Sequence, residues 1–283
     1  MTKVEIFEVG PRDGLQNETR EIPVAEKIAL IDCLSEAGFA RIEVASFVSP
    51  KWVPQMAGSG AVLAGIKRAS GVSYAALTPN MRGFEDARAA GADEVAIFGS
   101  ASEGFSRANI NASIEESLAR FRPVADAAQA ASIPVRGYVS CVVECPFDGL
   151  VPPEQVARVA RALFDMGCYE ISLGDTVGRA TPDGIDAMLR SVTSVVPANR
   201  LAGHYHDTGG RALDNIETSL GHGLRVFDAA VGGLGGCPYA PGAAGNVATE
   251  AVHDRLTALG HETGLDPAVL SRAAEMARAM RTG

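Results

Sequence analysis

The sequence of 283 residues lacks the features that would tie it to a membrane or to nucleic acid. Its apolar runs are short, with none approaching the roughly 18 residues that span a bilayer, and residues 1–10 lack the basic start and apolar stretch of a signal peptide. Lys and Arg are outnumbered, 25 against 34 Asp and Glu, so the net charge is −9. Because such a charge repels nucleic acid and anionic membrane surfaces, we expect neither as a partner.

Cysteine is scarce and its number is odd. With 47% apolar residues, a chain of this length can bury a sizeable core without disulfides. We therefore expect free thiols and a reducing, cytoplasmic location. The five cysteines are Cys33, Cys141, Cys145, Cys168 and Cys237.

Short runs rich in Val and Ile alternate with longer segments of helical periodicity, which is typical of repeated βα units around a parallel sheet. No linker interrupts the series, so we expect one catalytic domain over residues 1–283. Eight units close most naturally into a (β/α)8 TIM barrel, with a doubly wound open sheet as the alternative. An extra helix is expected over residues 266–281. The eight runs are residues 4–9, 41–45, 73–77, 94–98, 135–143, 170–173, 201–206 and 226–231.

The C-terminal ends of the strands form the mouth of such a barrel and hold its active site, so polar residues there carry the most weight. The first run leads into Gly-Pro-Arg-Asp-Gly, which places Arg12 and Asp13 side by side. A tight turn with a surface ion pair is the plainer interpretation. Glu43 lies near the end of the second run and Asp175 follows the sixth. We expect both to project into the same mouth, as catalytic or as supporting groups.

Two histidines lie two residues apart on the seventh run. Alternation along a strand points His204 and His206 to one side and Tyr205 toward the helices. Together with Asp13 and Asn246 they would offer two imidazoles, a carboxylate and an amide carbonyl. That donor set suits an octahedral divalent ion, Mg²⁺ or Mn²⁺, rather than structural zinc. A chance pair of histidines is the alternative.

A long segment of small residues, 232–246, follows the eighth run. A phosphate cradle is one interpretation, but the segment breaks the G-x-G-x-x-G pattern and has no P-loop lysine. Its glycines favour a mobile loop that carries Cys237 over the mouth. The alternative for Cys237 is a small buried apolar residue, which is the role we expect for the other four cysteines.

These segments together resemble the 3-hydroxy-3-methylglutaryl-CoA lyase family, and the similarity is nearly end to end. It runs from VGPRDGLQNE (residues 9–18) through SFVSPKWVPQM (46–56) to residues 232–250, which are similar to the family signature that contains a catalytic cysteine. The resemblance implies a metal-dependent barrel that performs a retro-Claisen cleavage to acetyl-CoA and acetoacetate, as in leucine degradation or ketone-body metabolism.

The resemblance also implies roles for positions of this sequence. Arg12 and Gln16 are candidates for contact with the acyl-CoA substrate, and the base that takes the hydroxyl proton is either Asp175 or His204. A homodimer is the assembly that we consider. The implied metal ligands are Asp13, His204, His206 and Asn246, while Arg12 stabilises the enolate, Glu43 orients its neighbours and Cys237 supplies or relays a proton.

Some positions near the mouth depart from the family pattern. Gly209 stands where an aromatic is expected, Val44 and Ala45 replace hydroxyl-bearing residues, and Thr19 replaces a basic residue. These changes leave open a lyase of the same mechanism that acts on a longer branched 3-hydroxy-acyl-CoA. A non-catalytic barrel that serves as a binding module is the remaining alternative.

Overall fold

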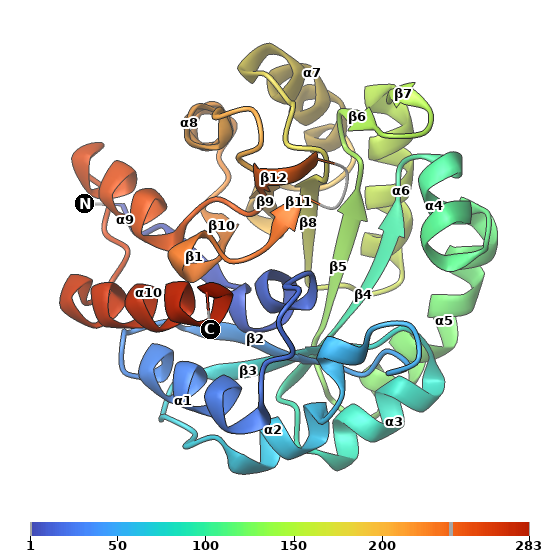
Figure 1. Cartoon of the computed structure of the whole chain (residues 1–283). Coiled ribbons are helices and arrows are strands. Elements are labelled where there is room, and N and C mark those ends of the chain that lie inside the picture. The colour runs from blue at the N-terminus through green and yellow to red at the C-terminus, as the bar shows by residue number, and fades with distance from the viewer. Residues whose placement is uncertain (1, 238–239, 283) are drawn as a thin grey trace.

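The structure is a computed structural model of the chain that describes residues 2–237 and 240–282, with the backbone alone at residues 236, 237, 240–244 and 282. Eight parallel strands close into a barrel, in the order β1-β10-β9-β8-β5-β4-β3-β2 with β2 pairing back onto β1 (Figure 1). The expected TIM barrel is confirmed. Its strands are β1 (Glu5–Glu8), β2 (Arg41–Ser46), β3 (Ser73–Leu77), β4 (Glu94–Ser100), β5 (Val135–Ser140), β8 (Glu170–Asp175), β9 (Leu201–Tyr205) and β10 (Val226–Ala229).

Helices surround the barrel and bury their apolar faces against it (Figure 1). In α6 the stripe of Val156, Val159 and Leu163 is fully buried, which is the reason this segment folds as an amphipathic helix. The helices are α1 (Val24–Ser35), α2 (Ser59–Gly65), α3 (Met81–Ala89), α4 (Glu103–Ile110), α5 (Ile114–Ala130), α6 (Pro153–Asp165), α7 (Pro182–Thr193), α8 (Ala212–Gly221), α9 (Thr249–Ala258) and α10 (Pro267–Thr282).

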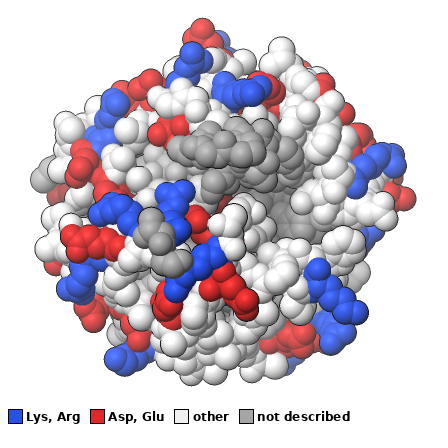
Figure 2. Space-filling view, viewed as in Figure 1, with Lys and Arg blue, Asp and Glu red and all other residues white. Residues whose placement is uncertain are grey.

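The expected extra helix at the end of the chain is α10, which packs against α1 and against the short 3₁₀ turn Val231–Gly233 that follows β10. Both chain ends lie on this side of the barrel, beside α9 and α10 (Figure 1). Among the described residues, no helix combines the length and the hydropathy needed to cross a membrane. Basic and acidic side chains are interspersed over the face shown in Figure 2, where the described residues form no large patch of one sign.

The barrel interior contains a column of alternating guanidinium groups and aromatic rings. Phe7 lies between Arg41 and Arg136, whose Cζ atoms are 4.9 and 4.4 Å from the centre of its ring. Tyr138 continues the column, with Arg136 at 4.9 Å and Arg12 at 5.5 Å from its ring centre. Cations stack favourably on aromatic faces, more so when both are removed from water. This column therefore fills the barrel interior, which layers of aliphatic side chains fill in most TIM barrels.

Three segments differ from the sequence expectation. The fifth strand ends at Ser140 and not at residue 143, because Cys141 adopts a left-handed backbone with φ +60° that breaks the extended run. Residues 144–150 then form a small hairpin, β6 (Glu144–Cys145) with β7 (Gly149–Leu150). The segment of small residues expected to be a long loop contains a second antiparallel pair, β11 (Gly236–Cys237) with β12 (Ala240–Ala244).

Candidate functional site

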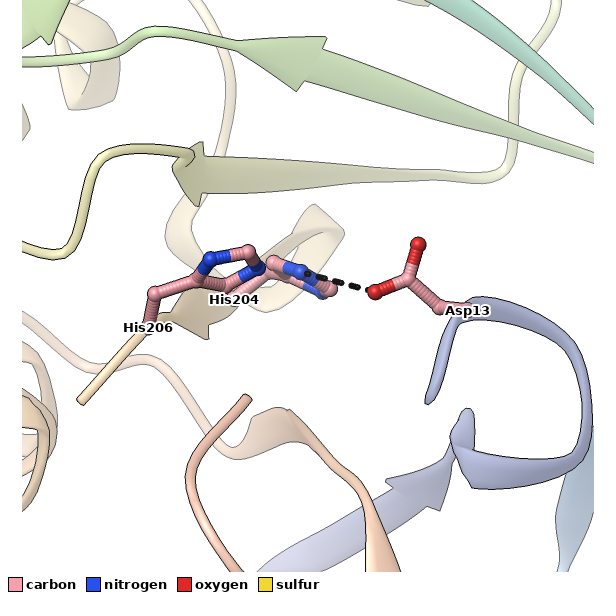
Figure 3. Close-up of side chains that lie close together, drawn as sticks. All are labelled: Asp13, His204 and His206. Atoms are coloured by element: carbon pink, nitrogen blue, oxygen red, sulfur yellow. Dashed lines mark ion pairs between the residues drawn. The ribbon is translucent and has the colours of Figure 1, made fainter. Parts of the chain in front are cut away.

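Asp13, His204 and His206 lie together at the mouth of the barrel (Figure 3). One potential ligand atom from each side chain falls within 4.8 Å of the others, and Nε2 of His204 is 3.8 Å from Oδ2 of Asp13. Asp13 belongs to a single π-helical turn (Gly10–Gly14) after β1, and the histidines lie at the end of β9. The cluster therefore brings together the ends of β1 and β9, which are the first and seventh barrel strands in chain order.

Strand alternation places the histidines as the sequence predicted. His204 and His206 both face the barrel axis, with ring centres 5.4 Å apart. Tyr205 between them faces outward, where its hydroxyl lies 2.8 Å from Ser219 Oγ of α8. The prediction that the two imidazoles share one face is therefore confirmed.

Asn246 joins the same cluster through backbone pairing. Residue 246 forms an isolated antiparallel bridge with His206, and the N–H of Val247 donates to the carbonyl of Tyr205. This pairing brings the Asn246 amide beside Asp13, to which its Nδ2 donates at 2.9 Å. All four residues expected to ligate a metal are thus brought together.

The charge states of the cluster suit a cation. Burial opposes ionisation of Asp13, but the combined effects of Arg12, the two histidines and the Asn246 hydrogen bond outweigh it and lower the pKa of Asp13 to about 2. Burial and the nearby His204 lower the pKa of His206 to about 4, so its imidazole is neutral at pH 7. Among the described residues, the buried Nδ1 of His206 has no hydrogen-bond partner. A carboxylate, the neutral imidazole of His206 and its orphaned nitrogen fit a divalent metal ion.

Arg12 connects the cluster to Glu43. Its Nη1 donates to Oδ1 of Asp13 at 2.6 Å, while Nε donates to Oε2 of Glu43 at 2.6 Å and Nη2 lies 2.5 Å from the same oxygen. Tyr138 also donates to that oxygen, at 3.1 Å. Arg12 is only 6% exposed and Glu43 is fully buried, so the alternative of a surface ion pair is wrong. Burial raises the pKa of Glu43, against the opposing effect of Arg12.

Asp175 does not reach this cluster, contrary to the sequence expectation. Its carboxylate accepts hydrogen bonds from the backbone N–H groups of Gly178 at 3.0 Å and Ala180 at 2.9 Å. Ser172 of the same strand points into the barrel, where it donates to Asp228. Since side chains alternate along a strand, Asp175 faces the helical layer, and its carboxylate holds the turn after β8.

The remaining candidates from the sequence either lie away from this cluster or have side chains outside the described residues. Gln16 lines a hollow of about 350 Å³ between residues 16–21 and 52–55, and its buried Oε1 has no partner among the described residues. The side chain of Cys237 lies outside the described residues, whereas its backbone pairs with β12. The other four cysteines are free and buried, as expected.

Three carboxylates that the sequence analysis missed hold the start of the glycine-rich segment. They accept backbone N–H groups, from Val231 to Glu8 at 3.0 Å, from Gly232 to Glu250 at 2.8 Å and from Gly235 to Glu18 at 3.2 Å. Glu8 also accepts from the N–H of Gly10 at 2.7 Å and from the Thr249 hydroxyl at 2.6 Å. Burial raises the pKa of Glu8 to about 7. The sequence signal that could have identified Glu8 was a carboxylate within an apolar strand.

A second group that sequence reasoning missed lies directly beneath the histidines. Oδ2 of Asp228, in β10, is 3.0 Å from Nδ1 of His204, and Asp228 itself accepts two hydrogen bonds from Arg136. All three side chains are buried in the barrel interior.

A TIM barrel whose mouth combines inward histidines, a carboxylate, an amide and a buried arginine defines a class of metal-binding barrel proteins. Within that class the chain belongs to the HMGL-like family, whose model matches residues 3–277 and whose enzymes are metal-dependent.

Individual relatives agree with this assignment. The chain is 60% identical to the "3-hydroxy-3-isohexenylglutaryl-CoA/hydroxy-methylglutaryl-CoA lyase" of Pseudomonas aeruginosa, over 93% of this chain and 88% of that protein. The crystal structure of the HMG-CoA lyase from Brucella melitensis superposes with a TM-score of 0.99 at 61% identity and covers 100% of both chains. An HMG-CoA lyase from Acinetobacter baumannii, solved with coenzyme A and 3-methylmalate, gives 0.93 at 36% identity over 99% of this chain and 92% of that one.

Proposed function

We propose that this chain is a carbon–carbon lyase that cleaves 3-hydroxy-3-methylglutaryl-CoA to acetyl-CoA and acetoacetate. The observation that carries the proposal is the cluster of Asp13, His204, His206 and Asn246 with Arg12 against it, in a chain 60% identical to a lyase of this name. The reaction removes a hydroxyl proton, breaks a carbon–carbon bond and leaves its electron pair on the acetyl-CoA carbon. It therefore needs a Lewis acid and a cationic partner for the enolate.

The four clustered residues would hold the metal, for which we propose Mg²⁺ or Mn²⁺ because all the donors are nitrogen or oxygen. When bound, the ion supplies Lewis acidity that lowers the pKa of a coordinated tertiary hydroxyl. The chain contributes the orientation of the ligands. Asn246 donates to Asp13 at 2.9 Å and so limits the positions that this carboxylate can take.

Arg12 is the group that we propose for stabilising the enolate. Its guanidinium is held by Glu43 on one side and Asp13 on the other, so little reorganisation is needed when charge develops on the substrate. Glu43 acts through Arg12, because its carboxylate is fully buried and bonded to Arg12 and Tyr138.

Neither residue considered as the base is free to take the hydroxyl proton in this arrangement. Asp175 faces the helical layer and accepts two backbone N–H groups, so we propose that it holds the turn over residues 175–180. His204 has Nδ1 occupied by Asp228, and Nε2 is the atom that we assign to the metal.

Cys237 is our candidate for the proton donor to the departing carbon. The thiol would give its proton to the enolate carbon as the electron pair arrives there, and the thiolate left behind would regain the proton that the hydroxyl releases, so that the step balances. Support comes from the similarity of residues 232–250 to the lyase signature and from the flanking Gly235, Gly236 and Pro238, whose side chains carry no group able to exchange a proton.

The parent substrate is favoured over a longer branched homologue. Val44 and Ala45 are buried in the core, at 2% and 1% exposure. A Cβ at Gly209 would lie 2.9 Å from the carbonyl oxygen of Gly178, so glycine there serves a close backbone contact. These departures from the family pattern therefore do not by themselves enlarge a substrate pocket. The longer homologue remains the second candidate because the Pseudomonas aeruginosa relative carries both substrates in its name.

One assay tests the reaction and the substrate together. Purified protein is incubated with 3-hydroxy-3-methylglutaryl-CoA or its 3-isohexenyl homologue, with Mg²⁺, Mn²⁺ or a chelator, and the products are identified by mass. We expect acetyl-CoA and acetoacetate from the parent ester, at a rate that the chelator abolishes. A metal-independent reaction, or cleavage of the homologue alone, would contradict the proposal.

We further propose that residues 1–283 form one catalytic domain, that the protein acts in the cytoplasm and that it assembles as a homodimer. A single cooperative unfolding transition, fractionation of cells and light scattering on the purified protein test these three points.

A further inference from the structure

The two histidines of the cluster differ in what their second ring nitrogen contacts. Nδ1 of His204 lies 3.0 Å from Oδ2 of Asp228, which is fully buried on the neighbouring strand β10. Nδ1 of His206 is buried without a partner among the described residues. Of the two, and within the described part of the chain, only His204 therefore has a protein group that fixes its ring.

Asp228 is itself held in one orientation. Arg136 donates from Nη1 to Oδ2 at 2.9 Å and from Nη2 to Oδ1 at 2.7 Å, which is a two-pronged pairing across the barrel interior. Ser172 donates its hydroxyl to Oδ2 at 2.8 Å. A carboxylate paired with a guanidinium only accepts hydrogen bonds, so Nδ1 of His204 carries a proton and Nε2 is the nitrogen left for a metal. That Nε2 is the atom directed toward Asp13, at 3.8 Å.

We propose that Asp228, held by Arg136, is a positioning residue that fixes the ring orientation and tautomer of His204 and so presents Nε2 to the metal. The inference rests on the metal site of the proposed function. Histidines that bind metals commonly donate their other N–H to a carboxylate, and loss of such a partner weakens metal binding by about 10- to 100-fold.

The first test needs no metal. Two-dimensional ¹H–¹⁵N spectra of the imidazole rings in the metal-free protein report which nitrogen carries the proton. We expect the Nδ1–H tautomer for His204, and a shift toward Nε2–H in Asp228→Ala. An Nε2–H tautomer for His204 in the unchanged protein would overturn the proposal.

The second test measures Mn²⁺ affinity by calorimetry in variants whose folding is checked by thermal unfolding. Asp228→Ala removes the acceptor and should bind Mn²⁺ about 10- to 100-fold more weakly. Asp228→Asn keeps an acceptor oxygen for Nδ1 and should fall between Asp228→Ala and the parent.

Glu170 supplies a matched control, because it is buried and accepts from Nε of the same Arg136 at 2.7 Å, with no hydrogen bond to a histidine among the described residues. Glu170→Gln removes the same charge beside the same guanidinium and should leave Mn²⁺ affinity unchanged. If Asp228→Ala does not fold, the comparison of Asp228→Asn with Glu170→Gln decides the question. Equal affinity in Asp228→Asn and the parent, or an equal loss in Glu170→Gln, would overturn the proposal.

The two tests separate this inference from the proposed function. A parent protein that binds no Mn²⁺ would contradict the metal site, while the tautomer spectra would still decide the role of Asp228. Conversely, a parent that binds Mn²⁺ and cleaves the ester, with variants at Asp228 of equal affinity, would contradict the positioning role alone.

Discussion

Replacing Arg12 by Lys tests the proposed enolate stabiliser. The guanidinium reaches Glu43 and Asp13 at once, through contacts of 2.5–2.6 Å, and stacks on Tyr138. A lysine ammonium is a compact charge that cannot bridge both carboxylates and also face the substrate. Removing one such preorganised donor costs about 3–4 kcal/mol in the barrier, so we expect kcat to fall about 10²- to 10³-fold. The assay is acetyl-CoA release at saturating metal, with thermal unfolding as the check on folding.

Arg41→Lys is the control for this experiment. Arg41 lies at the other end of the interior column, where it pairs with Glu5 at 2.6 Å and Glu170 at 3.0 Å and stacks on Phe7. Both substitutions remove a guanidinium from a buried network, but only Arg12 borders the metal cluster. We expect the Arg41 variant to lose stability without loss of turnover. A folded Arg12→Lys protein with near-parental turnover, or an Arg41→Lys protein equally impaired, would refute the argument.

Three further predictions concern the metal cluster, the thiol and a buried acid. His206→Ala should weaken Mn²⁺ binding and lower turnover together, with partial recovery at high Mn²⁺; full activity at trace metal would contradict its ligand role. Cys237→Ala should keep Mn²⁺ affinity but lower the rate by orders of magnitude, whereas Cys168→Ala should leave the rate unchanged. Thiol-blocking reagents should inactivate the parent protein, and inactivation that maps to another cysteine would refute the role of Cys237. Glu8 has a folded-state pKa of about 7, above its ordinary value of 4.5, so its contribution to stability is fully present below pH 4.5 and is lost as pH rises through 7. Glu8→Gln should flatten that dependence, which spans on the order of 3 kcal/mol, in urea unfolding between pH 5 and pH 8, and an unchanged slope would show that another group is responsible.

The strands and the histidine pair could be predicted because both follow from local periodicity. Apolar runs of four to nine residues bounded by turns mark strands without knowledge of their partners. The direction of His204 and His206 follows from alternation alone. Asp175 shows the limit of the same rule. The sequence placed it after a strand that ended at residue 173, whereas β8 continues to Asp175 and turns its side chain outward.

The interior network could not be predicted because it depends on which strands meet across the barrel. Arg136 and Asp228 are 92 residues apart on strands that are not neighbours, and each lies in a run that reads as an ordinary buried strand. Neither residue has a local signal for its partner. The distinction between an ion pair and an isolated buried charge appears only when the barrel closes.

The carboxylates that hold the start of the glycine-rich segment also define how that segment could be exchanged. Every bond they make there is to a backbone N–H, at residues 231, 232 and 235, so side chains of the segment contribute none of this attachment. Gly232, Gly233 and Gly235 have φ of 66°, 63° and 95°, a region that favours glycine. A segment grafted from another protein, together with residue 231 that precedes it, therefore needs an N–H at those three positions, which excludes proline, and glycine where φ is positive. The recipient must supply Glu8, Glu18 and Glu250. In a barrel without these three carboxylates the grafted segment would keep its sequence but would not be held in the same position.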